Sequence, residues 1–258
     1  MGPGELSFQL RHLKQVVRHR ASGGDLRPVR FVIFGRGRSG STTLVSLLDS
    51  LPGVHCDGEI LHRRVQFPRQ HVHAMCAESS RAAYGCKILS YQLLTVQPLR
   101  RRTEFIRRLA HDGFSVLYLT RENVVEHAVS NIRARQLGFH QSADNPTISQ
   151  AVTVHHDDLM RWIDHSETLA HFERASLVGV PHLALTYERD LAVASRHQTT
   201  VQRVGEFVGL PEPPEARTGS EFGKISPPTL RESVANYDQL VSFLRNTPLA
   251  TYLNDDDD

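Results

Sequence analysis

The strongest constraint on the fold lies between residues 29 and 51, where an apolar run, a glycine-rich loop and a helical pattern follow one another. The run VRFVIF at residues 29–34 is short and rich in β-branched and aromatic residues, which is typical of a buried parallel strand. The loop GRGRSGST occupies residues 35–42, and the helical pattern after it is closed by Pro52 and Gly53. This order of strand, loop and helix predicts an α/β fold with the loop at the carboxyl end of a strand.

The same alternation continues along the chain. Short apolar runs predict further strands at residues 85–91, 114–119 and 181–187. Apolar periodicity predicts helices at residues 7–21, 102–111, 122–136, 147–176 and 193–208. Thr147 would cap the fourth of these helices. We therefore expect a P-loop-like three-layer α/β/α sandwich around a central, mostly parallel sheet.

Length and organisation favour a single domain. The chain has 258 residues, of which 40% are hydrophobic, enough for one sizeable core. No internal repeat and no convincing linker divides it, so we predict one domain over residues 1–258.

The charge balance restricts the class of partner. Lys and Arg number 30 against 28 Asp and Glu, a formal net charge of +2. Such a chain has no global positive field that would hold nucleic acid by counterion release, so no nucleic-acid partner is expected. An anionic ligand would have to be bound locally, by a few placed cations.

Cysteine usage and hydropathy bear on location. The three cysteines are odd in number and lack C-x-x-C spacing, which favours neither disulfides nor zinc and is typical of a reducing cytoplasm. No apolar run approaches the about 18 residues of a membrane span, and the first residues lack a signal-peptide core. We expect a cytoplasmic protein without a stable membrane anchor. The basic helix at 7–21 could lie on the domain or on a membrane surface.

The glycine loop nearly fits the nucleoside-triphosphatase pattern G-x-x-x-x-G-K-[ST], with Gly35, Gly40 and Thr42 in place. Ser41 stands where that pattern has lysine, and a positive charge is found instead at Arg38. The predicted strands also lack an acid at their ends that would hold magnesium. The loop therefore indicates binding of phosphate or sulfate through backbone amides and arginine, without a metal.

A second anion-binding element is predicted at the end of the strand at 114–119. Arg121 follows this strand, and Ser130 lies nine residues further on. Nine residues is two and a half helical turns, so Arg121 must precede the helix if both side chains are to meet one phosphate. A surface arginine at a helix start remains the alternative for this position.

Together these elements resemble the sulfotransferases that use 3′-phosphoadenosine-5′-phosphosulfate (PAPS). The RSGST stretch resembles their 5′-phosphosulfate motif, and Arg121 with Ser130 resembles their 3′-phosphate motif. The likeness covers about residues 30–135, with weaker echoes at 186–191 and 224–240. The Arg-Ser-Gly-Ser form is similar to the carbohydrate and bacterial branch rather than to the cytosolic branch.

The resemblance implies an enzyme that moves a sulfuryl group from PAPS to a hydroxyl of a small-molecule, saccharide or glycolipid acceptor and releases 3′,5′-adenosine bisphosphate (PAP). It implies a nucleotide-binding core at 29–135, a helical acceptor-side region at 136–180 and a C-terminal strand and helices at 181–254. The amphipathic N-terminal helix, within residues 1–24, precedes them. Arg38 would contact the oxygen that bridges phosphate and sulfate. The residues implied to cradle the 5′ end are Gly37, Ser39, Gly40, Ser41, Thr42 and Thr43.

The resemblance also implies where the acid–base chemistry and the closing segment lie. Glu59, in the sequence Gly58-Glu59, would be the general base, with His62 and His55 as rivals because an imidazole titrates near neutrality. Lys87, within an apolar strand, would face the sulfuryl group or the acceptor, or else extend to solvent at the strand end.

Lys224 and Arg231 are implied to close over the nucleotide, although the cytosolic branch's Arg-Lys-Gly is absent.

Other interpretations stay open at this point. A metal-dependent kinase-like phosphoryl transferase and a non-catalytic nucleotide-binding or adaptor protein are the alternatives. The arginines at 100–102 and 107–108 could attract an acidic acceptor or nucleic acid, or form a solvated helix surface. The helix at 7–21 is the segment that we suspect of forming a homodimer.

Overall fold

The computed structural model describes residues 3–22, 25–138, 150–211 and 229–253. The chain divides into two compact units, which are described separately. Unit 1 comprises Met1–Thr120 and His171–Thr218, and unit 2 comprises Arg121–Ala170 and Gly219–Asp258. The single domain expected from the sequence stays a prediction. Within the described ranges, no helix combines the length and the apolarity needed to span a bilayer.

The core of unit 1 is a five-stranded sheet in which every pairing is parallel, in the order β2-β3-β1-β4-β5. Its strands are β1 (Val29–Gly35), β2 (Val54–Glu59), β3 (Ala83–Leu89), β4 (Ser115–Thr120) and β5 (His182–Thr186). The predicted α/β class with a parallel central sheet is confirmed. The strand β1 lies in the centre and is buried over its last five residues, as its apolar sequence predicts.

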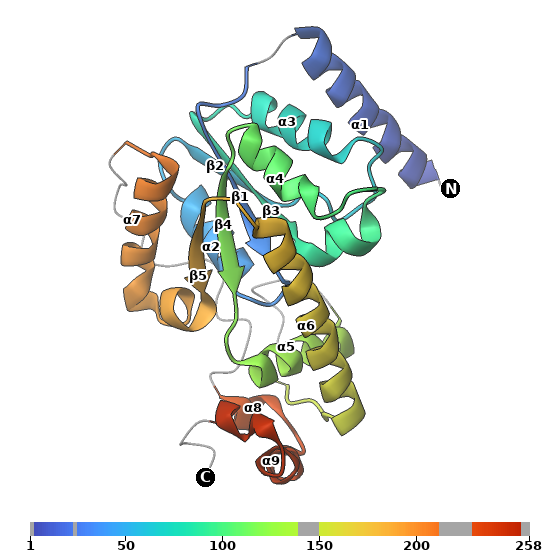
Figure 1. Cartoon of the computed structure of the whole chain (residues 1–258), viewed down its shortest axis with the longest axis vertical. Helices are drawn as coiled ribbons and strands as arrows, with labels where there is room; N and C mark the ends of the chain where they lie inside the picture. Colours follow the sequence, from blue (N-terminus) through green and yellow to red (C-terminus); the bar gives the residue numbers. More distant parts are fainter. Residues whose placement is uncertain (1–2, 23–24, 139–149, 212–228, 254–258) are drawn as a thin grey trace. The chain divides into compact units, whose positions relative to one another are not determined.

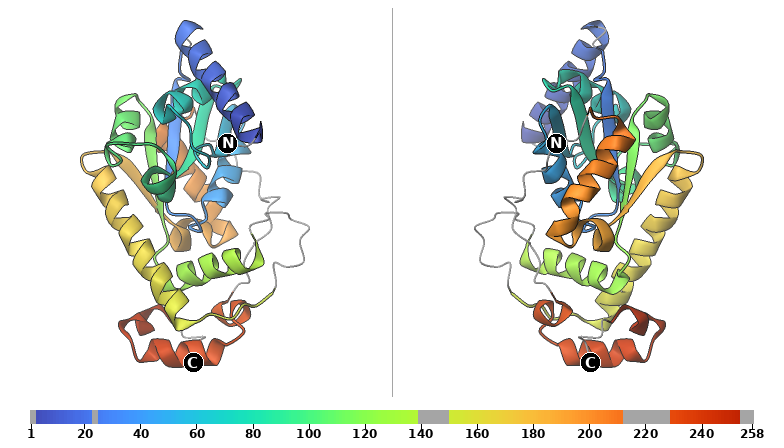
Figure 2. Two further views of the ribbon diagram at one scale, coloured as in Figure 1. Left: turned by 90° about the vertical axis from the view of Figure 1, so that its right-hand side faces the viewer. Right: turned by 90° about the vertical axis from the view of Figure 1, so that its left-hand side faces the viewer.

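Helices cover both faces of this sheet (Figures 1 and 2), which gives the expected three layers. One apolar cluster packs α2 (Ser41–Asp49) and α7 (His197–Val208) against Ile33 and Leu117. The opposite cluster packs α3 (Pro68–Glu78), α4 (Glu104–His111) and the end of α6 (His156–Leu177) against residues that include Phe34. The helix α1 (Pro3–Ser22) packs against α3. The short helical segments of unit 1 are η1 (Gln92–Val96), η3 (Tyr187–Leu191) and η4 (Ala194–Arg196).

Unit 2 contains α5 (Val124–Leu137), the first part of α6, α8 (Leu230–Ser233), α9 (Tyr237–Arg245) and η5 (Pro248–Tyr252). The predicted helix start at 147 is wrong for residues 150–155, and Thr147 itself lies outside the described residues. Val152 pairs instead with Val234 as an isolated parallel bridge, and the Val154 amide donates to Asn236 Oδ1 at 2.9 Å. Because these backbone groups are bonded across the unit, the helix begins only at His156.

A pair of histidines joins α1 to α3. His12 and His71 are both buried, and their Nδ1 atoms lie 3.2 Å apart, so one ring donates and the other accepts. Burial lowers the pKa of both side chains, and that of His71 falls to about 4. The neutral rings therefore stabilise the folded state above their ordinary pKa of about 6.5, and this stability is lost as the pH falls from there towards the folded value.

We expect protonation of this histidine pair to lower the free energy of unfolding by about 1 kcal/mol between about pH 7.5 and pH 5.5. Urea denaturation at the two pH values measures the drop. The variant His12→Asn should reduce the pH dependence, because His71 then loses its imidazole neighbour. His62→Asn is the control, since His62 is exposed and should leave the dependence unchanged.

Candidate active site

The glycine loop connects β1 to the first turn of α2. Its backbone is left-handed at Arg38, with a φ of 64°, and at Gly40, with a φ of 80°. The Gly40 carbonyl accepts from the Leu44 amide at 3.1 Å, while no side chain caps α2 and no acidic residue lies in its first turn. Since the first amides of a helix have no intrahelical partner, this N-terminus favours an anion.

Ser39 adds a second indication of a ligand at the loop. Its side chain is fully buried, and its hydroxyl has no hydrogen-bond partner among the described residues. A buried hydroxyl without a partner costs free energy, which an oxygen of a bound anion would recover. Ser41 is buried, and Gly37, Arg38, Thr42 and Thr43 are half-buried. The predicted cradle residues are therefore gathered at one helix start.

Lys87 supplies a cation to the same place. It lies on β3, where its side chain is 7% exposed, and its Nζ is 3.3 Å from Thr42 Oγ1. The same Nζ is 3.2 Å from Glu59 Oε1. The ammonium therefore points towards α2 and does not extend into solvent. The structure thus brings together Thr42, Glu59 and Lys87, three of the residues that the sequence singled out.

The Glu59 carboxylate is held by two residues that sequence reasoning missed. Its Oε2 accepts from Gln92 Nε2 at 2.8 Å and from the Tyr91 hydroxyl at 3.2 Å. Gln92 is fully buried, and its Oε1 accepts from the Leu89 amide at 3.0 Å. Burial and the charge of Glu59 raise the pKa of Tyr91, which keeps that hydroxyl a donor. Their position just after a parallel strand was the available signal.

A bulge in β2 sets the direction of Glu59. Asp57 pairs with Cys86 and Glu59 pairs with Lys87, so Gly58 is an extra residue between two consecutive pairs. Without the bulge, Glu59 would share the face of Asp57, because side chains alternate along a strand. Asp57 accepts from the Tyr84 hydroxyl at 2.9 Å on the opposite face. Because of the bulge, Glu59 faces Lys87 and Asp57 does not.

The two rival histidines are placed differently. His62 is exposed, and its Nδ1 donates to the Glu59 carbonyl at 2.6 Å, so its ring contacts the backbone of Glu59. His55 lies 3.2 Å from both Asp49 and Asp57. His55 therefore contacts carboxylates other than that of Glu59. The Glu59 carboxylate is the one that Lys87 contacts.

A buried ion pair supports the start of the loop. Arg36 Nε lies 3.5 Å from Glu173 Oε2, and this oxygen also accepts from the Tyr118 hydroxyl at 3.0 Å. Glu173 is fully buried, and burial raises the pKa of its carboxyl. Sequence reasoning missed this contact. The signal was a glutamate on the apolar face of a helix, between Phe172 and Leu177, since a buried carboxylate demands a partner.

The remaining predicted residues belong to unit 2, and of these Lys224 lies outside the described residues. Arg121 precedes α5, as its spacing from Ser130 requires, and its Nη2 lies 2.5 Å from Glu126 Oε2. Ser130 is buried within α5. Arg231 is exposed on α8, with its guanidinium 4.1 Å from the ring centre of Tyr237. The roles of these residues stay predictions.

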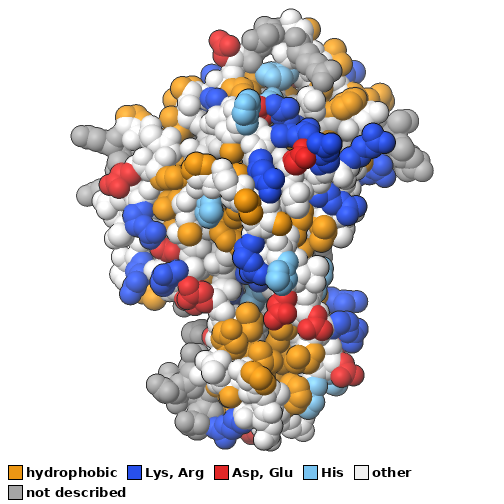
Figure 3. All heavy atoms as spheres, viewed as in Figure 1, with side chains coloured by type: hydrophobic (Ala, Val, Ile, Leu, Met, Phe, Trp, Pro, Cys, Tyr) orange, Lys and Arg blue, Asp and Glu red, His pale blue; other side chains and the backbone are white. Residues whose placement is uncertain are grey.

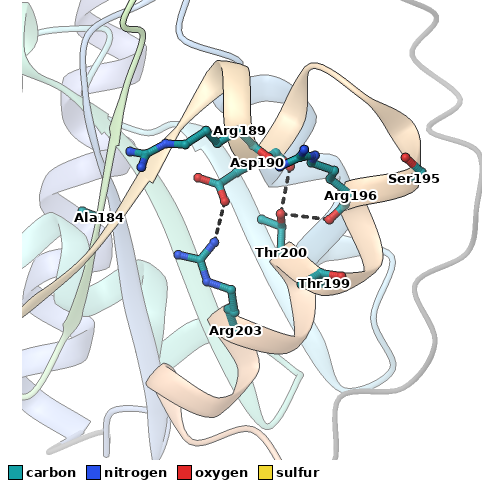
Figure 4. Close-up of a pocket in the computed structure, with 8 residues that line it drawn as sticks. All are labelled: Ala184, Arg189, Asp190, Ser195, Arg196, Thr199, Thr200 and Arg203. Atoms are coloured by element: carbon teal, nitrogen blue, oxygen red, sulfur yellow. Dashed lines mark hydrogen bonds and ion pairs between the residues drawn. The ribbon is translucent and has the colours of Figure 1, made fainter.

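A separate pocket of about 410 Å³ lies beside η3 and α7 (Figure 4). Its lining includes Arg189, Arg196 and Arg203, but none of the predicted site residues. Arg203 points to the buried Asp190, with 2.5 Å between Nη1 and Oδ1, and the other carboxylate oxygen accepts from the Thr186 amide at 2.7 Å. This carboxylate therefore partly balances the basic lining.

The two glycines of the site should respond differently to a methyl group. A Cβ on Gly40 would lie 2.7 Å from the Tyr187 ring and would sit on a left-handed backbone, whereas a Cβ on Gly58 would meet nothing within 4 Å. We expect Gly40→Ala to lower the free energy of unfolding by about 1–2 kcal/mol. Gly58→Ala should stay within about 0.5 kcal/mol of the parent. Denaturant titration compares them, and equal losses would contradict the close packing at Gly40.

In the described ranges, no group of three or more His, Cys, Asp and Glu side chains is arranged to hold a metal ion. No protein-family model and no curated protein sequence matches this chain.

Proposed function

We propose that this protein is a sulfotransferase that moves a sulfuryl group from PAPS to a hydroxyl of a small-molecule, saccharide or glycolipid acceptor. One observation carries the proposal. At the start of an uncapped helix, the Lys87 ammonium lies between the Thr42 hydroxyl and the Glu59 carboxylate. An anion site, a cation and a base thus occur within one small cluster, as transfer of an anionic group to a hydroxyl requires.

In this proposal the loop binds the 5′ end of the donor. The first amides of α2 and the buried Ser39 hydroxyl donate to phosphate oxygens, and Arg38 supplies the positive charge. Arg121 and Ser130 bind the 3′-phosphate, because a guanidinium and a hydroxyl suit a phosphate monoester. Arg231 contacts the nucleotide from the C-terminal part of the chain. The bound donor supplies the sulfuryl group and a phosphate leaving group.

Glu59 acts as general base towards the acceptor. It takes the proton of the acceptor hydroxyl as that oxygen bonds to sulfur and the bond from sulfur to the phosphate oxygen breaks, which releases PAP. Gln92 and Tyr91 hold one carboxylate oxygen in place. Lys87 stabilises the negative charge that develops on the transferred group, and the Arg38 charge serves the leaving phosphate.

A cytoplasmic location and metal-independent turnover are parts of this proposal. Cys56, Cys76 and Cys86 are free and buried, which suits a reducing compartment. Lys87 and Arg38 provide positive charge where a phosphoryl transferase of the P-loop type would use lysine and magnesium.

Ligand-dependent stability tests the nucleotide. We expect PAP at about 100 times its dissociation constant to stabilise the folded protein by about 2.7 kcal/mol, with the same effect in EDTA. ATP with magnesium should stabilise it much less. Ser39→Ala should reduce the effect of PAP, and Ser195→Ala, at the separate pocket, is the matched control. Magnesium-stimulated ATP hydrolysis would overturn the proposal in favour of a kinase-like enzyme.

Substitution of Glu59 tests the base. We expect Glu59→Gln to lower kcat by about 10²–10⁴-fold while the affinity for PAP is kept, because the amide retains the shape but not the basicity of the carboxylate. Asp57→Asn is the matched control, since Asp57 lies on the same strand and faces Tyr84. Near-normal turnover of the Glu59 variant would instead assign the role to His62, which the variant His62→Asn would then confirm.

A further inference from the structure

Arg36 is an arginine of the glycine loop that the proposed reaction leaves without a role. Arginine is ordinarily solvated, and Figure 3 shows Lys and Arg side chains exposed over much of the face that it presents. Arg36 is buried instead, and within the described ranges Arg133 is the one other buried arginine. It follows directly after β1 and precedes Arg38 by two residues. A guanidinium leaves water at such a place only for a partner inside the protein.

The partner of Arg36 is the Glu173 carboxylate. With side chains 9% and 0% exposed, this is the most deeply buried ion pair that the described residues form. Glu173 lies near the end of α6, in the stretch that packs on the sheet through Phe172 and Leu177. Both members of the pair belong to unit 1. The pair therefore joins the start of the loop to a helix that the apolar core already holds in place.

Tyr118 fixes the position of this carboxylate. Its hydroxyl donates to the same Glu173 oxygen that Arg36 contacts. Burial raises the pKa of Tyr118, so the hydroxyl stays a donor. The Tyr118 ring contacts those of Phe34 on β1 and His182 on β5, with centroid distances of 6.3 and 5.8 Å. Three adjacent strands thus hold the ring that holds Glu173.

The loop needs this support because its backbone is strained. Among the described residues other than glycine, Arg38 alone has a positive φ, of 64°. A side chain in this region is unfavourable, and the conformation persists only where the surroundings enforce it. After Arg38, Gly40 packs so closely on Tyr187 that a Cβ would lie 2.7 Å from its ring. Before Arg38, the ion pair of Arg36 fixes the chain. The strained residue is therefore enclosed between two fixed points.

We propose that Glu173 is a positioning residue for the glycine loop. Through Arg36, and supported by Tyr118, it holds Arg38 in the left-handed conformation and keeps the start of α2 ready for the 5′ end of the donor. Glu173 itself does not touch the donor. The inference rests on the proposed function for the identity of the ligand, and on the buried ion pair for the geometry of the loop.

Replacement of the entire buried cluster tests this role. The apolar variant carries Arg36→Met, Glu173→Leu and Tyr118→Phe, which removes both charges and the hydroxyl together. Because a buried ion pair can be exchanged for apolar side chains of similar volume without loss of stability, this variant should unfold within about 5 °C of the parent. Glu173→Gln alone is unsuitable, since it would leave the Arg36 guanidinium buried without its carboxylate.

A matched control makes the same kind of change away from the loop. Asp112 is bonded to Arg69 and His73, as Glu173 is to Arg36 and Tyr118. It lies just before β4, at the amino end of the parallel sheet, whereas the loop lies at the carboxyl end. The control variant therefore carries Arg69→Met, Asp112→Leu and His73→Phe.

Hydrogen exchange without nucleotide measures the positioning directly. The Leu44 amide reports on the loop, because it donates to the Gly40 carbonyl at 3.1 Å. The Ile33 amide, in the central strand β1, is the reference for the fold. We expect the Leu44 amide to exchange about tenfold faster in the apolar variant and less than about twofold faster in the control, while Ile33 keeps its parent rate. Equal acceleration of both amides, or of neither, would overturn the inference.

Calorimetric titration with PAP on the same samples separates this inference from the proposed function. We expect the apolar variant to bind PAP about tenfold more weakly than the parent and the control variant. Faster exchange at Leu44 in a protein whose parent form does not bind PAP would remove the proposed reaction and keep Glu173 as the residue that holds the loop. PAP binding of equal strength in the parent and the apolar variant would remove the positioning role and leave the proposed function intact.

Discussion

The pairing of one buried cation organises this molecule. Lys87 lies in a strand whose residues are all buried, and moving an unpaired ammonium out of water costs several kcal/mol. Thr42 on α2 and Glu59 on β2 meet that demand. A residue of the central layer thereby fixes the loop helix and the edge strand to each other. The arrangement that we interpret as catalytic therefore first of all provides the buried Lys87 ammonium with its partners.

Much of the fold could be predicted because strands that are buried on both faces have continuous apolar sequences. The runs that became β1, β3 and β4 were identified in this way, with ends shifted by a few residues. The strand β5 was also identified, although it lies at the sheet edge and is buried only at its last two residues, because its sequence is still mostly apolar. The strand β2 was missed because it carries His55, Asp57 and Glu59, so it has no apolar run. The helix α3 was missed for a related reason, since its histidines and arginine hide its apolar stripe. The late start of α6 follows from pairing with a distant segment, which a local pattern does not contain.

The residues of the candidate site differ in the same way in how far the sequence predicts them. Local sequence indicated the loop and Lys87, and the resemblance to a known family pointed to Glu59. The contacts of Gln92 and Tyr91 depend on how β2 and β3 are registered, which is a property of two strands about thirty residues apart in sequence. The support of Arg36 by Glu173 crosses an even longer stretch of chain. Sequence reasoning therefore found groups with a strong local signature and missed those defined by tertiary neighbours.

The bulge at Gly58 has a consequence for how this strand can vary in length. An insertion or deletion within a buried strand ordinarily turns every later side chain to the wrong face. Removal of Gly58 would make Asp57 and Glu59 direct neighbours on opposite faces, which is the arrangement that the bulge already produces. The strand can therefore lose this residue and keep Glu59 opposite Lys87. Position 58 is thus a point where a change of chain length is compatible with unchanged chemistry.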